Sequence, residues 1–256
     1  MIPDNQRPFT LEVAAHSLTS AIAAAEAGAH RIELCVALEV GGLTPGMGLL
    51  KQVRDEISLP INVLIRPRTG NFCYDSSELR TIQRSIEVYK TEGVNGFVFG
   101  CLTANDEIDR SVVDQVMSWV DPLPFTFHRA FDCVRDPYQS LRQLASCSVR
   151  TVLTSGQSGT AWEGRELLKS LISMGENIEI MAGSGIHGGN IRELADYTGI
   201  RTFHSSAKTF QEGLSSEQHQ RISMLFGKMY ERDGKWESSQ KEINRMIVAM
   251  SMAEES

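Results

Sequence analysis

The 256-residue sequence lacks the features that define several large classes of protein. No apolar run approaches the roughly 20 residues of a membrane-spanning helix, and segment 1–10 lacks the apolar core of a secretion signal. The 25 lysines and arginines are outnumbered by 32 acidic residues and form no basic block, which argues against nucleic acid as a partner. We therefore expect a cytoplasmic protein that binds neither membranes nor nucleic acid.

Cysteine and the usual metal-binding spacings are also scarce. The five cysteines are odd in number and scattered, so a disulfide framework is not expected. The sequence has no Cys-x-x-Cys pair, no methionine-rich tract and no two histidines at ligand spacing. No preformed metal site can therefore be read from the spacing of these residues.

What the chain does contain is a repeated alternation of β-like and helix-length segments. Eight short β-like runs each lead into a turn rich in glycine, charged or hydroxyl residues. This alternation predicts a (β/α)8 TIM barrel, a fold that needs about 250 residues and carries its chemistry on the loops after the strands. We expect residues 1–256 to form a single domain of this kind. The predicted strands are Leu11–Ala14, Arg31–Cys35, Ile61–Ile65, Gly96–Phe99, Phe125–His128, Thr151–Leu153, Ile178–Ala182 and Thr202–His204.

The ends of several predicted helices are marked in the sequence. Ser17 is expected to cap the first helix, and Asp136 followed by Pro137 to open the fifth, because a short polar side chain and a proline suit a helix start. Glycine accepts the left-handed conformation that ends a helix. Four glycines lie shortly before a predicted strand and are expected to end helices, namely Gly28, Gly93, Gly175 and Gly199.

The C-terminal part departs from this repeat. We interpret residues 209–239 as a long loop after the eighth strand that contains a short helix near Ser215–Phe226. The final helix is predicted from an apolar stripe at helical spacing. The stripe consists of Ile243, Met246, Ile247 and Met250.

Charged and small residues gather where the predicted strands end. In a parallel barrel these ends meet at one mouth, so the side chains are expected to converge there. Glu33 and Cys35 share one face of their strand because strand side chains alternate. The candidate catalytic residues are Glu33, His128 and His204. The candidate ligand-binding residues are Glu12, Arg66, Arg68, Arg129, Asp132, Ser155, Gly183, Ser184, Gly185, Ser205 and Ser206.

The loops after the seventh and eighth strands favour an anionic ligand. Barrels often bind phosphate there through backbone N–H groups, and Gly183–Gly185 and Ser205–Ser206 fall at these two places, with Lys208 close behind. The pattern predicts a small anionic or phosphorylated ligand. The alternative, that the two segments are only tight turns, remains open at this point.

The chemistry of the charged residues also allows two interpretations. In the first, the three arginines hold the anion through bidentate contacts, His128 or His204 exchanges a proton near neutral pH, and Glu33 acts as a base or orients a neighbour. In the second, Glu33 and Arg66 form a structural ion pair inside the barrel. The residues alone assign no reaction, and whether the chain is an enzyme stays open.

Seven segments together resemble the CutC family, over roughly residues 10–208. They are Arg31–Cys35, Gly41–Pro45, Ile65–Arg68, Phe97–Gly100, Phe127–Asp132, Leu153–Gly156 and His204–Ala207. The resemblance implies a cytoplasmic TIM barrel, named for copper homeostasis and often described as copper-binding, that forms a homo-oligomer. The family has no firmly assigned enzymatic reaction.

Copper binding would involve Cys35, because Cu(I) prefers thiolate or thioether ligands. Cys35 is the cysteine that lies within a matching segment, and Cys73, Cys101 and Cys133 also fall near strand ends. Ala14 stands where the resemblance implies a cysteine in many relatives, which removes a second thiolate. The sequence thus supports two hypotheses. One is a copper homeostasis protein that binds Cu(I) through Cys35, and the other is an enzyme or binder of a small anionic ligand at the barrel mouth.

Overall fold

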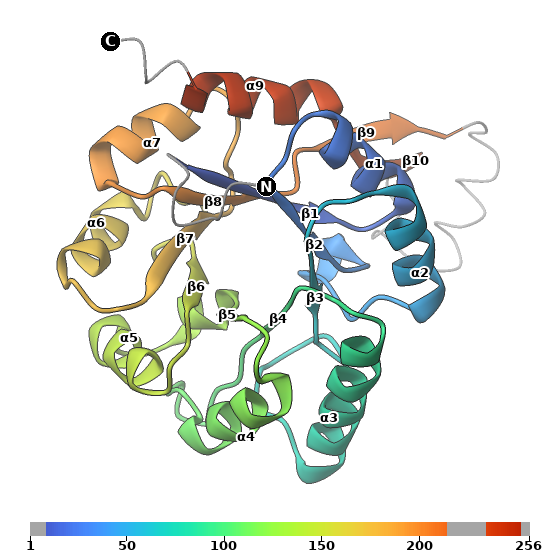
Figure 1. The fold of residues 1–256 in the computed structure, drawn as a ribbon. Coiled ribbons are helices and arrows are strands. Elements are labelled where there is room, and N and C mark those ends of the chain that lie inside the picture. Colours follow the sequence, from blue (N-terminus) through green and yellow to red (C-terminus); the bar gives the residue numbers. More distant parts are fainter. Residues whose placement is uncertain (1–8, 214–233, 252–256) are drawn as a thin grey trace, which may run out of the picture.

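The computed structural model describes residues 9–213 and 234–251 and contains a closed barrel of eight parallel strands inside a ring of helices (Figure 1). The strands of the barrel are β1 (Thr10–Ala15), β2 (Arg31–Leu34), β3 (Ile61–Leu64), β4 (Gly96–Phe99), β5 (Phe125–Phe127), β6 (Thr151–Thr154), β7 (Glu179–Gly183) and β8 (Thr202–Ser205). The helices are α1 (Leu18–Glu26), α2 (Met47–Glu56), α3 (Ser76–Thr91), α4 (Arg110–Val120), α5 (Pro137–Ser146), α6 (Arg165–Ser173), α7 (Ile191–Thr198) and α9 (Gln240–Ser251), with 3-10 turns η2 (Leu38–Val40) and η3 (Arg129–Cys133).

The predicted (β/α)8 architecture is confirmed. Each strand pairs in parallel with the next along the chain, and β8 returns to pair with β1, where Glu12 lies opposite His204. Every predicted strand lies within one residue of the observed one at each end. None of the helices in the described ranges is both long and apolar enough to cross a membrane.

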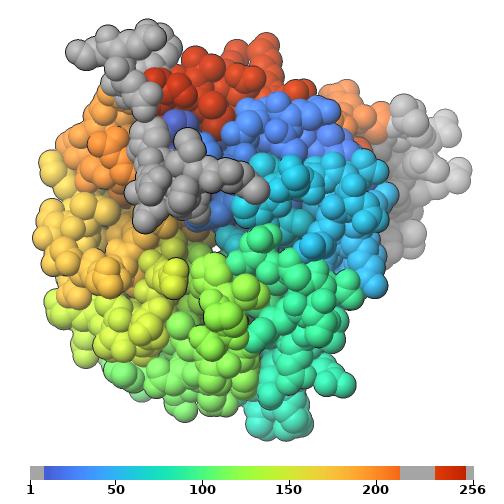
Figure 2. Space-filling view, in the orientation of Figure 1, coloured from blue at the N-terminus to red at the C-terminus, as the bar shows by residue number. Residues whose placement is uncertain are grey.

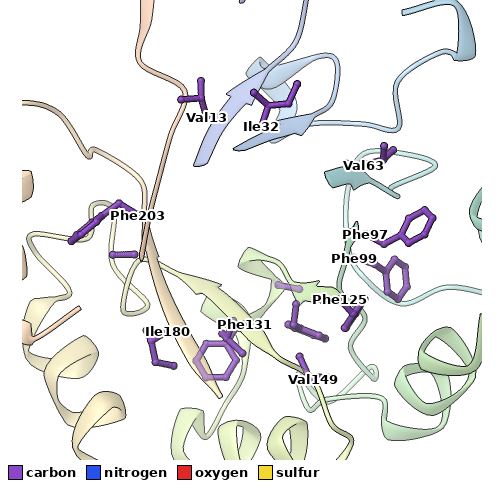
Figure 3. Close-up of a cluster of buried hydrophobic side chains, with 14 of the residues drawn as sticks. Val13, Ile32, Val63, Phe97, Phe99, Phe125, Phe131, Val149, Ile180 and Phe203 are labelled. Carbon is purple, nitrogen blue, oxygen red and sulfur yellow. The ribbon is translucent and has the colours of Figure 1, made fainter. Parts of the chain in front are cut away.

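Alternation along the strands sorts their side chains into two sets. One set, which includes Phe97, Phe99 and Phe203, is buried in the main hydrophobic cluster around the strands (Figure 3). The alternate positions, such as Glu33 and His128, line a pocket at the barrel mouth. Burying one large apolar side chain contributes about 1.5–3 kcal/mol, so the first set supplies the stability that lets the second set be polar.

The predicted helix boundaries are observed. The Ser17 side chain accepts a hydrogen bond from the Ser20 backbone N–H at 3.0 Å and caps α1. Asp136 caps α5 in the same way, with Pro137 at the first helical position. Gly199 ends α7 with a φ of +83°, a left-handed conformation that favours glycine. The other three glycines expected to end helices also have positive φ.

The C-terminal part differs from the sequence interpretation. Where a long loop was expected, β9 (Lys208–Glu212) and β10 (Gly234–Ser238) form an antiparallel ribbon in which Phe210 lies opposite Trp236. Five-residue strands joined by a long segment give a weak alternation signal, which is why the sequence did not indicate them. The short helix predicted near Ser215–Phe226 lies outside the described residues.

The last helix closes the ring. α9 lies between α7 and α1, in the place of an eighth barrel helix (Figure 1), and its predicted apolar stripe buries Ile243, Met246 and Met250. The space-filling view shows this last segment, in red, directly beside the blue N-terminal helix (Figure 2). The ribbon is joined to the same helix, because Ser20 Oγ donates to the buried Glu237 carboxylate at 2.7 Å.

Candidate functional site

The mouth of the barrel holds a pocket of about 1100 Å³. It is lined from the ends of every barrel strand except β4, and one wall continues onto the start of β9 and onto α9. The structure brings eleven of the predicted site residues together on its lining. They are Glu33, Cys35, Arg66, His128, Arg129, Asp132, Ser184, Gly185, His204, Ser205 and Ser206.

Four predicted ligand-binding residues, Glu12, Arg68, Ser155 and Gly183, are absent from that lining. Gly183 ends β7, where a Cβ atom would lie 2.5 Å from the Leu153 side chain, so this glycine permits close packing inside the barrel. In this structure the four residues support the walls of the mouth, their contact with a ligand stays a prediction, and the other three are described below.

Glu12 is a buried carboxylate that organises one side of the mouth. Its side chain is 0% exposed and accepts hydrogen bonds from Arg31 Nε at 2.6 Å and Asn62 Nδ2 at 2.9 Å. Its other oxygen lies 3.0 Å from His204 Nδ1. Burial would raise the pKa of Glu12, but Arg31 and His204 outweigh it and lower that pKa to about 2. Glu12 therefore stays ionised and fixes the His204 ring.

Glu33 and His204 form the end of this arrangement that faces the pocket. His204 Nε2 lies 3.6 Å from Glu33 Oε2, and both side chains line the pocket. Burial and the charge of Glu12 raise the pKa of Glu33 to about 7 against the opposing effect of His204. Burial lowers the pKa of His204, but the two carboxylates outweigh it and raise that pKa above its ordinary value. This pair can exchange a proton near neutral pH.

His128 stands in a different environment. Its Nδ1 accepts a hydrogen bond from the Ala130 backbone N–H at 3.1 Å, so the neutral ring carries its proton on Nε2. Burial and the charge of Arg66 lower the pKa of His128 to about 3. Of the two histidines expected to exchange a proton near neutral pH, His204 therefore fits that role better, because burial and Arg66 favour the neutral form of His128. Its Nε2–H is buried without an acceptor among the described residues.

Arg66 lies beside His128 and does not pair with Glu33. Its Nη1 donates to the carbonyls of Val40 at 2.8 Å and Gly42 at 3.0 Å, and its Nη2 donates to Gly70. The predicted structural ion pair between Glu33 and Arg66 is thus replaced by backbone contacts that hold the loops after β2 and β3. Its Nε is buried without a partner in the described part of the chain.

Phe72 contacts both of these basic side chains. The centroid of its ring lies 5.0 Å from that of His128 and 5.2 Å from the Arg66 guanidinium carbon. Phe72 lines the pocket and belongs to the loop between β3 and α3. No feature of the sequence around position 72 indicated this contact, because it depends on how the loop folds back over the mouth.

Arg129 and Asp132 sit on η3, directly after β5. Arg129 Nε donates to Asp132 Oδ2 at 2.7 Å, and its Nη2 donates to Ser155 Oγ at 3.0 Å. Asp132 also accepts the backbone N–H of Ser155 at 3.0 Å. Ser155 is therefore a buried support that orients Arg129 and Asp132, which themselves line the pocket.

The loops after β7 and β8 are linked to each other. Ser205 Oγ donates to the Ile186 carbonyl at 2.8 Å and accepts the Ala207 backbone N–H at 3.1 Å. Ser184 and Gly185 both have positive φ, at +77° and +69°, and a Cβ atom on Gly185 would lie 2.9 Å from Thr160. This wall is thus built from small residues held in a left-handed turn.

Two cations on the same wall were not among the predicted site residues. Lys208 lines the pocket while its Nζ lies 4.8 Å from the centre of the Trp236 ring. Arg245 reaches the lining from α9. The position of Lys208 directly after Ser205–Ala207 was a usable signal, whereas nothing near Arg245 indicates that the last helix borders the mouth.

Arg68 points away from the mouth and into its own loop. Its guanidinium donates to Glu78, which belongs to the capping box at the start of α3, and to the carbonyls of Asn71 and Cys73, each at 2.8 Å. These contacts lie outside the pocket lining, and the role of Arg68 in holding an anion stays a prediction. Arg68 ties the loop after β3 to the first turn of α3.

The cysteines form no metal centre in this structure. Cys35 is fully buried on the pocket lining, and burial together with the nearby Glu33 raises the pKa of its thiol well above the ordinary value. Cys133 is exposed and lines the same pocket. Across the described residues, no group of three or more His, Cys, Asp or Glu side chains could hold a metal ion. The donor set does not fit a preformed copper centre.

Comparison with known proteins identifies relatives of this sequence. A model of the CutC family matches residues 9–209. A CutC family protein from Histophilus somni strain 2336 is 39% identical over 235 residues, which make up 91% of this chain and 96% of the relative. A second, from Salmonella enteritidis PT4, is 39% identical over 214 residues, or 84% of this chain and 86% of the relative.

Solved structures agree with this relationship. A CutC protein from Streptococcus agalactiae, described as a candidate copper homeostasis protein, is 31% identical and superposes with a TM-score of 0.73 over 77% of this chain and 98% of its own. Thiamine phosphate pyrophosphorylase from Pyrococcus furiosus is 14% identical, with a TM-score of 0.58 over 96% of each chain. The second likeness shows that the fold is that of TIM barrels.

Proposed function

This chain belongs to the CutC family, and we propose that it binds a small anionic, phosphorylated ligand at the mouth of its barrel and carries out acid–base chemistry on it. The observation that carries this proposal is the pocket itself. One wall offers the small residues after β7 and β8 with the cations Lys208 and Arg245, and Glu33 and His204 line the same pocket beside it.

The anion would lie against the wall formed by Ser184, Gly185 and Ser206. Glycine and serine allow a phosphate group to approach the backbone N–H groups closely, as in other barrels that bind phosphate between the last two strands. Lys208 and Arg129 would add charge at the rim, because both side chains border the pocket. Glu33 and His204 would then exchange a proton with the bound molecule.

Native mass spectrometry of freshly purified, reduced protein tests this proposal. We expect a co-purified anionic mass, and we expect inorganic phosphate to bind more weakly by about tenfold after Lys208→Ala. Arg68→Ala is the matched control, because it removes an equal charge from a loop outside the pocket and should leave the affinity within about twofold of wild type. Equal losses in both variants, or no binding of phosphate to wild type, would contradict the proposal.

Copper is the second candidate ligand. It is supported by the description of the Streptococcus agalactiae relative and by the presence of Cys35 and Cys133 on one pocket. In this case Cys35 would bind Cu(I) as a thiolate after losing its proton. A stoichiometric Cu(I) adduct that survives a competing chelator and disappears in Cys35→Ser would favour copper. Weak, non-stoichiometric binding would favour the anionic ligand. A cytoplasmic location and a homo-oligomer remain predictions.

A further inference from the structure

Two buried hydrogen-bond donors on the pocket lining have no acceptor among the described residues. They are Nε2–H of His128 and Nε–H of Arg66, and each residue is only 6% exposed. A buried donor that makes no hydrogen bond destabilises the folded protein, so such donors are rare and call for an explanation. Two of them on the lining of one pocket are typical of a site whose acceptor arrives with a ligand.

The two donors belong to residues of one pocket. Arg66 and His128 both line it, and the charge of Arg66 is among the causes that lower the pKa of His128. The Phe72 ring contacts both side chains. It is half-buried on the loop after β3 and lines the same pocket.

The chemistry of the donors favours an oxygen acceptor that carries or develops negative charge. The His128 ring is neutral and presents an N–H, while Arg66 adds a positive charge beside it. Neutral imidazole N–H groups polarise substrate carbonyls in known isomerases, and donors aimed at developing negative charge stabilise an oxyanion. A carbonyl oxygen that becomes an enolate oxygen would match this pair.

The same pocket holds a carboxylate suited to remove a proton. Glu33 Oε2 faces His204 Nε2 at 3.6 Å, and no hydrogen bond within residues 9–213 and 234–251 engages Oε1. His204 is in turn held by Glu12. One oxygen of Glu33 is therefore oriented by a fixed imidazole, and the other can meet a ligand.

We propose that His128 and Arg66 form an oxyanion subsite and that the pocket enolises a small phosphorylated ketone or aldehyde with a C–H next to its carbonyl. This inference rests on the proposed function, because the wall after β7 and β8 would hold the phosphate group. Glu33 and His128 are the catalytic residues of this proposal, and His204 and Glu12 are positioning residues.

The step conserves atoms and electrons. An oxygen of Glu33 bonds to the proton as the C–H bond breaks, and the released electron pair forms a C=C bond. The carbonyl π pair moves onto oxygen, and the resulting enolate oxygen accepts hydrogen bonds from His128 and Arg66. The protonated Glu33 exchanges its proton with water and returns one to carbon, so that in D2O a C–H becomes a C–D without oxidation or reduction.

Proton exchange in D2O tests the proposal directly. The full chain is incubated with glycolaldehyde phosphate, dihydroxyacetone phosphate and ribulose 5-phosphate, and loss of the C–H signals is followed by proton NMR. We expect exchange above the enzyme-free rate for at least one probe, and a loss of about 100-fold or more in Glu33→Gln. Glu39→Gln removes an equal charge from an exposed position, and its exchange rate should equal that of wild type.

Two substitutions of His128 test the oxyanion subsite separately. His128→Leu removes the donor and should lower the exchange rate by about 100-fold. His128→Gln keeps an N–H in the same place and should retain most of the rate, which a merely structural role of the ring does not explain. Equal losses in both variants would overturn the assignment of the donor.

Three results separate this proposal from the one on which it rests. Binding of a probe without exchange overturns enolisation and leaves the anionic ligand. Neither binding nor exchange with any probe overturns both. Independently of any probe, nitrogen NMR of the His128 ring should show a neutral Nε2–H form at pH 5, and a protonated ring or the Nδ1–H form there would remove the basis of the subsite.

Discussion

The two histidines of the mouth occupy equivalent places in the fold and behave in opposite ways. His128 follows β5 and His204 lies in β8, and both border the same pocket. Burial lowers the pKa of each ring. At His204 two carboxylates reverse that effect, whereas at His128 the charge of Arg66 adds to it. The partner groups, and not the depth of burial, therefore decide which histidine can exchange protons.

The largest expected effect comes from removing the carboxylate that reverses the shift at His204. Glu12→Gln should lower the free energy of unfolding by about 3 kcal/mol at pH 7, because it leaves Arg31 and His204 buried without this negative charge. The pKa of His204 should fall toward that of His128. Urea denaturation and proton NMR of the ring measure the two effects, and an unchanged His204 pKa would contradict the comparison.

The same variant has a pH signature. The pKa of Glu12 falls from 4.5 to about 2 on folding, so the unfolded chain binds a proton on Glu12 between these pH values and the folded chain does not. Wild type should therefore lose about 3 kcal/mol of stability as the pH falls through this window. Glu12→Gln should lose less over the same range, which acid titration of the urea midpoint would show.

The second largest effect is expected from a substitution that displaces the His128 ring and leaves His204 in place. Gly100 has no side chain, and a Cβ atom there would lie 2.4 Å from His128 Nδ1. Gly100→Ala should push the ring aside, break its hydrogen bond from Ala130 and cost about 1–3 kcal/mol through overpacking. The His204 pKa should not move. A shift of both rings would show that the two sides of the mouth are coupled.

The third prediction compares the Glu33 carboxylate with that of Glu12, because folding shifts their pKa values in opposite directions. The pKa of Glu33 rises from 4.5 to about 7 on folding, so the folded chain holds a proton between these values that the unfolded chain has released. Stability should fall as the pH rises through this window. Glu33→Gln should remove that fall and be more stable than wild type at pH 8 by on the order of 1 kcal/mol. Chemical denaturation at pH 5 and pH 8 tests the sign.

The smallest effect concerns the two arginines after β3. Arg66 lines the pocket, and Arg68 serves its own loop. Arg68→Ala should loosen the start of α3, seen as faster amide exchange there, and leave the affinity for phosphate within about twofold. A large loss of phosphate affinity in Arg68→Ala would instead indicate that Arg68 contacts the ligand.

Sequence reasoning identified the framework of the mouth because its signals are local. Strand alternation was enough to put Glu33 and Cys35 on one face, and glycines and caps were enough to bound the helices. Partners were predicted less well. The ion pair between Glu33 and Arg66 was predicted from their opposite charges alone. In the structure Glu33 lies beside His204 of β8, which is far away along the chain.

Other features depend on how distant segments meet. Arg68 looked equivalent to Arg66 because both follow one strand at the same parity, and only the folded loop shows that Arg68 meets Glu78. The direction of the His128 pKa shift requires knowing that its ring is enclosed beside Arg66. Arg245 borders the mouth only because α9 fills the eighth helix position. No local pattern encodes any of these.

The placement of α9 and β10 also bears on the order of events during synthesis. The ribosome releases α1 early and these two elements last. Yet the buried Ser20 of α1 donates to Glu237 of β10, and α1 borders the gap that α9 fills. A nascent chain that ends near residue 209, where the match to the family model stops, has all eight barrel strands and an open flank. During synthesis, α1 therefore lacks its contacts with β10 and α9 until both of these elements have left the ribosome.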